Sequence, residues 1–129
     1  MIVVDTSTWI DAFRRPAGAI ATRLRSLLDE DEVALALPVR LELLADVSRR
    51  DRSALSKALT GLHVLRPSQD TWALIERWVP LAADKGHRFG LADLVIAALT
   101  EEIAGLVWSL DDDFRRLERL KLVHCYDGP

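Results

Sequence analysis

The chain has 129 residues, of which 50% are hydrophobic, and its formal net charge is −3. This length predicts a single domain over residues 1–129, and the lack of a basic segment with a long apolar run before Asp5 predicts that there is no secretory leader. The negative net charge argues against binding nucleic acid through overall charge, although arginine occurs in local groups that suit phosphate, such as Arg49, Arg50 and Arg52.

Short apolar runs that end abruptly at polar residues predict buried strands. The first run ends at Asp5, and the fourth ends just before Ser109. In chain order, the predicted strands lie at residues 2–4, 33–37, 64–65, 106–108 and 122–123.

The intervals between these strands have the periodicity of helices. In the segment that starts at Leu91, apolar residues recur at the i, i+3, i+4, i+7 spacing of a helix that faces a core. Pro38 suits the first turn of one helix, and Ser68 suits the N-cap of another. In chain order, the predicted helices begin near Thr8, Ile20, Pro38, Asp51, Ser68, Leu91 and Phe114.

This alternation of strands and helices predicts an α/β fold, a three-layer α/β/α sandwich with a central, mostly parallel five-stranded sheet. Ligands of such sheets bind at the carboxyl ends of the strands. Asp5 follows the first predicted strand and Asp111 follows the fourth, so we expect one acidic pocket at this end of the sheet.

Solubility alone explains poorly the positions of four acidic residues, namely Asp5, Glu42, Asp93 and Asp111. Asp113 is a fifth. Each has a structural interpretation, because Asp5, Asp93 and Asp111 suit helix N-caps or first turns and Glu42 suits a solvated helix position. Considered together, they form a set of carboxylates without a histidine or cysteine ligand. Such a set fits Mg²⁺ or Mn²⁺, argues against zinc and suits hydrolysis of a phosphodiester.

Four motifs that contain these acids resemble those of the PIN-domain ribonucleases, in particular the VapC toxins of bacterial and archaeal toxin–antitoxin pairs. In chain order, the motifs are Val4–Asp11, Pro38–Leu43, Gly90–Ala98 and Ser109–Phe114. The third is the most specific, because Asp93 opens an alanine-rich helix. In the fourth, Ser109 stands where threonine is common, and the run of three aspartates leaves the last acid open between Asp111 and Asp113. Asp46, one turn after Glu42, is a reserve candidate.

The resemblance implies a PIN-like fold and a Mg²⁺- or Mn²⁺-dependent endoribonuclease whose cut leaves a 5′-phosphate and a 3′-hydroxyl. In this interpretation Asp5, Asp93 and Asp111 hold the metal, and Glu42 orients the attacking water or holds a second ion. The residues expected to support them by hydrogen bonding are Thr6, Ser7, Ser109 and Asp113. The resemblance also implies an RNA substrate, a homodimer and a small antitoxin partner that inserts a segment near the acidic pocket.

Two other functions remain open at this point. A PIN fold without activity would act only as a binding or dimerisation module, although the presence of all four acids speaks against it. A phosphatase of the HAD-like class would also place an aspartate after the first strand. That class needs a second aspartate two positions after Asp5, where this chain has Ser7, and a lysine in a late motif, which is absent.

Other residue types give weaker signals. The single cysteine, Cys125, cannot form an internal disulfide and is expected to pack in a protein of the cytoplasm, with no membrane segment. His63, His87 and His124 lack the paired placement of a metal-independent ribonuclease, so we expect them to be structural or on the surface.

Overall fold

A computed structural model describes all of residues 1–129 and has four strands and seven helices. The strands are β1 (Ile2–Val4), β2 (Val33–Ala36), β3 (His63–Leu65) and β4 (Leu106–Trp108). The helices are α1 (Thr6–Arg14), α2 (Ala19–Asp29), α3 (Leu37–Asp46), α4 (Arg52–Thr60), α5 (Gln69–Asp84), α6 (Leu91–Glu102) and α7 (Asp112–Arg119). No helix is both long and apolar enough to cross a bilayer.

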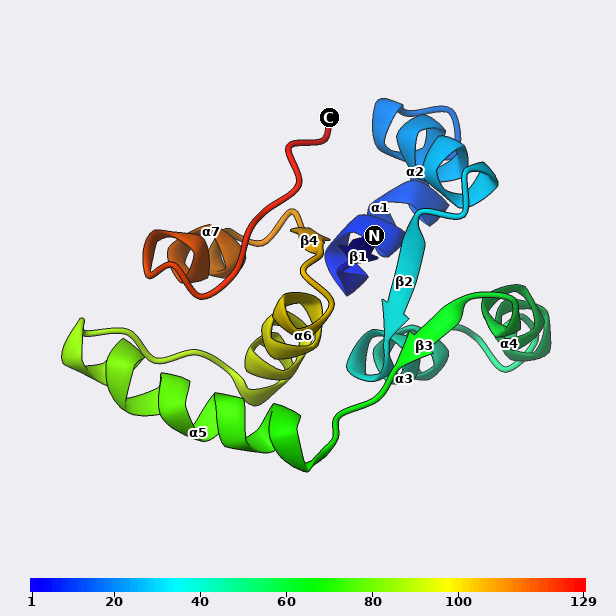
Figure 1. Cartoon of the computed structure of the whole chain (residues 1–129). Coiled ribbons are helices and arrows are strands. Elements are labelled where there is room, and N and C mark those ends of the chain that lie inside the picture. Colours follow the sequence, from blue (N-terminus) through cyan, green and yellow to red (C-terminus); the bar gives the residue numbers. More distant parts are fainter.

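The strands form one parallel sheet in the order β3-β2-β1-β4 (Figure 1). From β1 the chain moves outward through β2 to β3, and α5 and α6 then carry it back to β4 on the other side of β1. Because such crossovers are right-handed, this reversal places α5 and α6 on the opposite face of the sheet from the helices between β1 and β3. The carboxyl ends of β1 and β4 therefore flank the point where the strand order reverses, which is where α/β sheets form ligand crevices.

The central strands are buried on both faces. All three residues of β1 and all four of β2 are buried, as expected for parallel strands that helices cover on both sides. Helix α6 packs against β1, β2 and β4, and its residues Leu94–Thr100 are all buried. The run of small and branched residues in α6 thus fills the core, and the helix start, which carries Asp93, is left at the carboxyl end of the sheet.

The sheet has four strands, whereas the sequence predicted five. Leu122 and Val123 are buried, but they do not form a strand. Backbone pairing with β4 occurs slightly later, as a single parallel bridge between Val107 and Cys125. Lys121 has a φ of 62°, so the chain turns sharply after α7 and reaches the sheet only for this short stretch.

The remaining predicted elements agree closely with the structure. Ser68 caps α5 as predicted, in a capping box with Thr71. Helix α5 continues through Pro80, although a proline inside a helix removes one backbone hydrogen bond. Cys125 is half-buried, and burial together with the nearby Glu118 carboxylate raises the pKa of its thiol to about 11, so it is a protonated packing residue.

Candidate metal centre

The site begins where β1 and β4 end. These neighbouring strands are in register at Val4 and Trp108, so the residues that follow them, Asp5 and Ser109, emerge at the same level. The backbone amide of Asp5 donates to the carbonyl of Trp108 at 2.9 Å, and the Thr8 hydroxyl donates to the same carbonyl at 3.1 Å. The start of α1 is thereby fixed to the end of β4.

Asp5 is buried, and two hydroxyl groups hold its carboxylate. The Oγ of Ser7 donates to Asp5 Oδ2 at 2.9 Å, and the Oγ of Ser109 donates to the same oxygen at 2.7 Å. Each hydroxyl has one proton, so the 3.2 Å contact between the two serines is not a further hydrogen bond. The Oδ1 atom of Asp5 has no hydrogen-bond donor in the protein and is available to a ligand.

The two serines also position the loop after β4. The Leu110 amide donates to Ser7 Oγ at 3.1 Å, and the Asp111 amide donates to Ser109 Oγ at 2.9 Å. Each serine thus donates to Asp5 while accepting from the backbone that leads to Asp111. In this network both serine hydroxyls contact the Asp5 carboxylate, and the hydroxyl of Ser109 links Asp5 to the backbone amide of Asp111.

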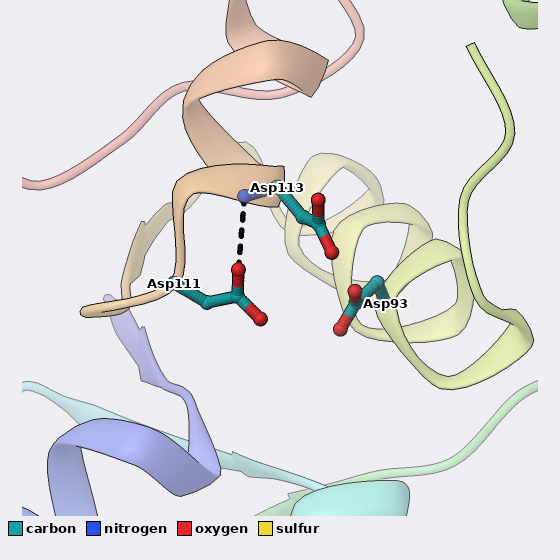
Figure 2. Close-up of side chains that lie close together, drawn as sticks. All are labelled: Asp93, Asp111 and Asp113. Atoms are coloured by element: carbon teal, nitrogen blue, oxygen red, sulfur yellow. Dashed lines mark hydrogen bonds between the residues drawn. The ribbon is translucent and has the colours of Figure 1, made fainter.

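Asp111 and Asp113 lie at the start of α7. Asp111 is the N-cap of this helix, because its Oδ1 accepts from the Asp113 amide at 3.1 Å. The carboxylate of Asp113 forms an ion pair with Arg116, one turn further along the same helix. Asp111 therefore has the role of a helix N-cap, and its second carboxylate oxygen still faces the site (Figure 2).

Asp93 completes the group from α6. One carboxylate oxygen from each of Asp93, Asp111 and Asp113 lies within 4.8 Å of the other two. Figure 2 shows the three carboxyl groups turned toward a common space between the starts of α6 and α7. Residues 93 and 111 thus meet because both helices begin at the same end of the sheet.

The crowding of like charges changes the protonation of Asp93. Its pKa is raised from the ordinary value of 3.8 to about 7. Partial burial is the largest cause, followed by the hydrogen bond that a protonated Asp93 shares with Asp113, and then by the negative charges of Asp5, Asp111 and Asp113. Asp5 lies outside the 4.8 Å set, and Ser109 links its carboxylate to the backbone of Asp111.

The other predicted residues lie in different surroundings. Glu42 is exposed on α3 and does not belong to the three-acid group, and neither does Asp46, which is exposed at the end of the same helix. The Thr6 hydroxyl is buried but has no hydrogen-bond partner, so the structure shows no contact through which it supports an acid.

The sequence did not predict two residues that contact the acid group or its partner, Arg116 and Phe89. Arg116 pairs with Asp113, and its guanidinium also lies over the ring of Phe89, 5.2 Å from the centroid. The spacing of three between Asp113 and Arg116 on one helix is a sequence signal that could have identified the pair. Phe89 lies in a loop, and no local pattern predicts its contact with α7.

The donor set fits a hard divalent cation. Three carboxylates converge here, with Asp5 linked to them through Ser109, and Arg116 is the one cation that forms an ion pair with any of the four. The site therefore has excess negative charge and contains oxygen ligands alone, which Mg²⁺ and Mn²⁺ prefer. A bound cation would also offset the repulsion that raises the pKa of Asp93.

Comparison with known proteins places this arrangement in a family. The family model described as PIN domain matches residues 2–120. Ribonuclease VapC18 of Mycobacterium tuberculosis is 34% identical over 119 residues, which cover 88% of this chain and 85% of that protein. Ribonuclease VapC11 of the same species is 26% identical over 125 residues and 93% of each chain.

Solved structures have the same fold. In the crystal structure of VapBC2 from Rickettsia felis bound to a promoter DNA fragment, one chain matches with a TM-score of 0.81 and 17% identity, over 100% of both chains. A chain of VapBC-5 from Mycobacterium tuberculosis matches with a TM-score of 0.66 and 27% identity, over 90% of this chain and 89% of that one.

Proposed function

This chain belongs to the PIN-domain family, and from that premise we propose that it is the endoribonuclease toxin of a toxin–antitoxin pair, dependent on Mg²⁺ or Mn²⁺. The observation that carries the proposal is the convergence of Asp93, Asp111 and Asp113, whose oxygens lie within 4.8 Å of one another beside the buried Asp5. The relatives named above are ribonucleases, and they match over most of their length.

We assign the metal to Asp93, Asp111 and Asp5, directly or through water. A bound divalent cation would lower the pKa of the attacking water and offset charge on the phosphate oxygens. The chain's own part is to fix the ligands: Ser7 and Ser109 orient the Asp5 carboxylate, so that its free Oδ1 points where a ligand can reach it. Asp113, held by Arg116, supports Asp111 through its backbone amide.

Glu42 has a separate part in this proposal. It lies on the helix that begins at the carboxyl end of β2, outside the three-acid group. Its carboxylate is exposed, and an exposed carboxylate can accept a proton from the attacking water or hold a second ion. We therefore assign Glu42 to the water or to a second ion and not to the first.

The partners follow from the relatives. The matching structures are of VapBC complexes, in which a toxin chain occurs with its antitoxin. We propose a small antitoxin that covers the acid site, an RNA substrate that the free toxin cuts, and a homodimer as the unit of assembly. Cellular RNA and an antitoxin would both be met in the cytoplasm.

Cleavage of a labelled RNA by the purified protein tests this function. We expect cutting with Mn²⁺ or Mg²⁺, none with EDTA, and products that carry a 5′-phosphate and a 3′-hydroxyl. Cutting in EDTA with 2′,3′-cyclic phosphate ends would contradict the mechanism, and no cutting with any divalent cation would favour a silent binding module. Expression should also arrest growth of the host cell, and harmless overproduction of protein that is active on RNA would remove the toxin assignment.

A further inference from the structure

A pocket of about 490 Å³ lies on the side of α6 that faces α5. It lies between the carboxyl-terminal end of α5 and the loop that leads into α6. Its walls include Val79 and Ala83 from α5, His87 and Phe89 from the loop, and Leu94 from α6. None of the acids lines the pocket, but Phe89 contacts Arg116, which is the ion-pair partner of Asp113, so the pocket wall is connected to the acid group.

The loop side of the pocket is rigidly placed. Gly86 has a φ of 78°, a left-handed conformation that suits glycine and turns the chain back on α5. The amides of Gly86 and His87 then donate to the carbonyls of Ala83 and Ala82, each at 2.9 Å. These bonds hold the backbone of His87 against the end of the helix.

An aromatic pair forms one wall. The rings of His87 and Phe89 stack with centroids 5.7 Å apart and an angle of 16° between their planes. Phe89 is buried and contacts Arg116, which is paired with Asp113 of the acid group. Phe89 thus packs behind His87, and the half-buried imidazole of His87 is the ring that a ligand can reach.

Several cations lie around this end of α5, whose last residue is the acid Asp84. Arg88, at the pocket wall, is exposed and forms no ion pair. A neighbouring groove at the ends of α5 and α7 is lined by three more cations and no acid, namely Lys85, Arg119 and Lys121. The ends of these two helices can be followed in Figure 1. None of these four cations is neutralised by an ion pair, although the chain as a whole has a net charge of −3.

We propose that this pocket binds one base of the RNA substrate next to the scissile phosphate, stacked on His87, and sets the enzyme's preference at that position. Proteins recognise single-stranded RNA by stacking its bases on aromatic rings while cations follow its backbone. The pocket has both features, and Phe89 and Arg116 connect its wall to Asp113 of the acid group. An apolar peptide would fit the pocket walls equally well, but it would leave the four unpaired cations without a partner.

The inference rests on the proposed ribonuclease function and has its own test. In Ala83→Phe the new ring fills the pocket without touching an acid. Ala73→Phe makes the same change at an exposed position ten residues earlier on α5, outside every pocket, and is the matched control. His87→Ala removes the stacking ring, and His87→Phe keeps a ring at that position.

The measurement is the cut rate, with Mn²⁺, of an RNA pool randomised around the cleavage site, followed by sequencing of the product ends. We expect wild type and Ala73→Phe to prefer one base at a single position beside the cut. Ala83→Phe and His87→Ala should flatten that preference and cut the preferred sequence on the order of tenfold more slowly, and His87→Phe should retain the preference.

Two results would overturn the inference while leaving the ribonuclease function intact. One is active cutting by Ala83→Phe and His87→Ala with an unchanged base preference. The other is an unchanged preference together with a change in oligomeric state in Ala83→Phe alone, which would make the pocket a protein contact. Failure of the wild type to cut any RNA would instead remove the proposed function itself.

Discussion

The Oγ of Ser109 donates a hydrogen bond to Oδ2 of Asp5 at 2.7 Å, although the two residues are 104 positions apart in the chain. The contact exists because β1 and β4 are neighbours in the sheet and end at the same level. The same Oγ accepts a hydrogen bond from the amide of Asp111. One hydroxyl thus aligns Asp5, which follows β1, with Asp111, the N-cap of α7 after β4. The acid site is therefore built on two strand ends.

Replacement of Ser109 tests this link. Ser109→Ala leaves a buried carboxylate with one hydroxyl donor in place of two, and we expect a loss of about 2 kcal/mol in the free energy of unfolding. Ser109→Thr keeps the hydroxyl and should be close to wild type. Ser53→Ala, at an exposed serine on α4 without a hydrogen bond, is the control in the same urea titrations. Equal stability of wild type and Ser109→Ala would show that the link contributes nothing.

The raised pKa of Asp93 predicts how stability without metal depends on pH. In the folded protein Asp93 releases its proton near pH 7, whereas in the unfolded chain it does so near pH 3.8, so the folded state binds more protons between these values. Its contribution is fully present below pH 3.8 and is lost as the pH rises through 7. Unfolding in EDTA should therefore become easier from pH 5 to 7.5, with a smaller slope in Asp93→Asn. Parallel slopes for the two proteins would contradict this.

Binding of a metal should restore the stability that the folded protein loses as the pH rises. Binding to the folded state alone stabilises it by RT ln(1 + [L]/Kd), about 2.7 kcal/mol at a hundredfold excess over Kd. For a domain of this size, this corresponds to a rise in Tm on the order of 10 °C with Mn²⁺. Asp93→Asn should melt higher than wild type in EDTA at pH 7.5 and gain little from Mn²⁺. An equal gain in both proteins would mean that Asp93 is not a ligand.

Glu42 should behave differently from Asp93. Because Glu42 lies outside the three-acid group, we expect Glu42→Gln to lose most of its RNA cleavage while retaining the Mn²⁺-dependent rise in Tm. Glu76→Gln, at an exposed glutamate on α5 outside the acid group, makes the same chemical change and is the control. Loss of the thermal shift in Glu42→Gln would make it a ligand of the first ion, and undiminished cleavage would leave it without a role.

Periodicity and strand ends were sufficient to predict much of this fold. The buried runs before Asp5 and Ser109 identified β1 and β4, and the spacing in α6 identified the helix that carries Asp93. The prediction of a fifth strand at residues 122–123 was wrong because burial alone does not make a strand. Those residues pack into the core, and the turn at Lys121 delays pairing until Cys125.

Contacts between elements could not be predicted in the same way. Phe89 meets Arg116 through packing of a loop on α7, and the distance between them in the chain carries no signal. The sequence also left the last acid open between Asp111 and Asp113. In the structure both face Asp93, with Asp111 capping the helix and Asp113 paired with an arginine, so each contributes to the same negatively charged site.

If the converging acids hold a metal with which the protein cuts RNA, removing the charge of one ligand must abolish cleavage. The measurement is the initial rate of RNA cleavage at saturating Mn²⁺ for wild type, Asp93→Asn and Asp112→Asn, with folding checked by circular dichroism. Asp112 is an exposed neighbour of the cluster but not a member of it, so Asp112→Asn makes the same change of charge beside the site. We predict at least about a hundredfold loss for Asp93→Asn and a near wild-type rate for Asp112→Asn. A folded Asp93→Asn protein that cuts RNA at the wild-type rate would contradict the account.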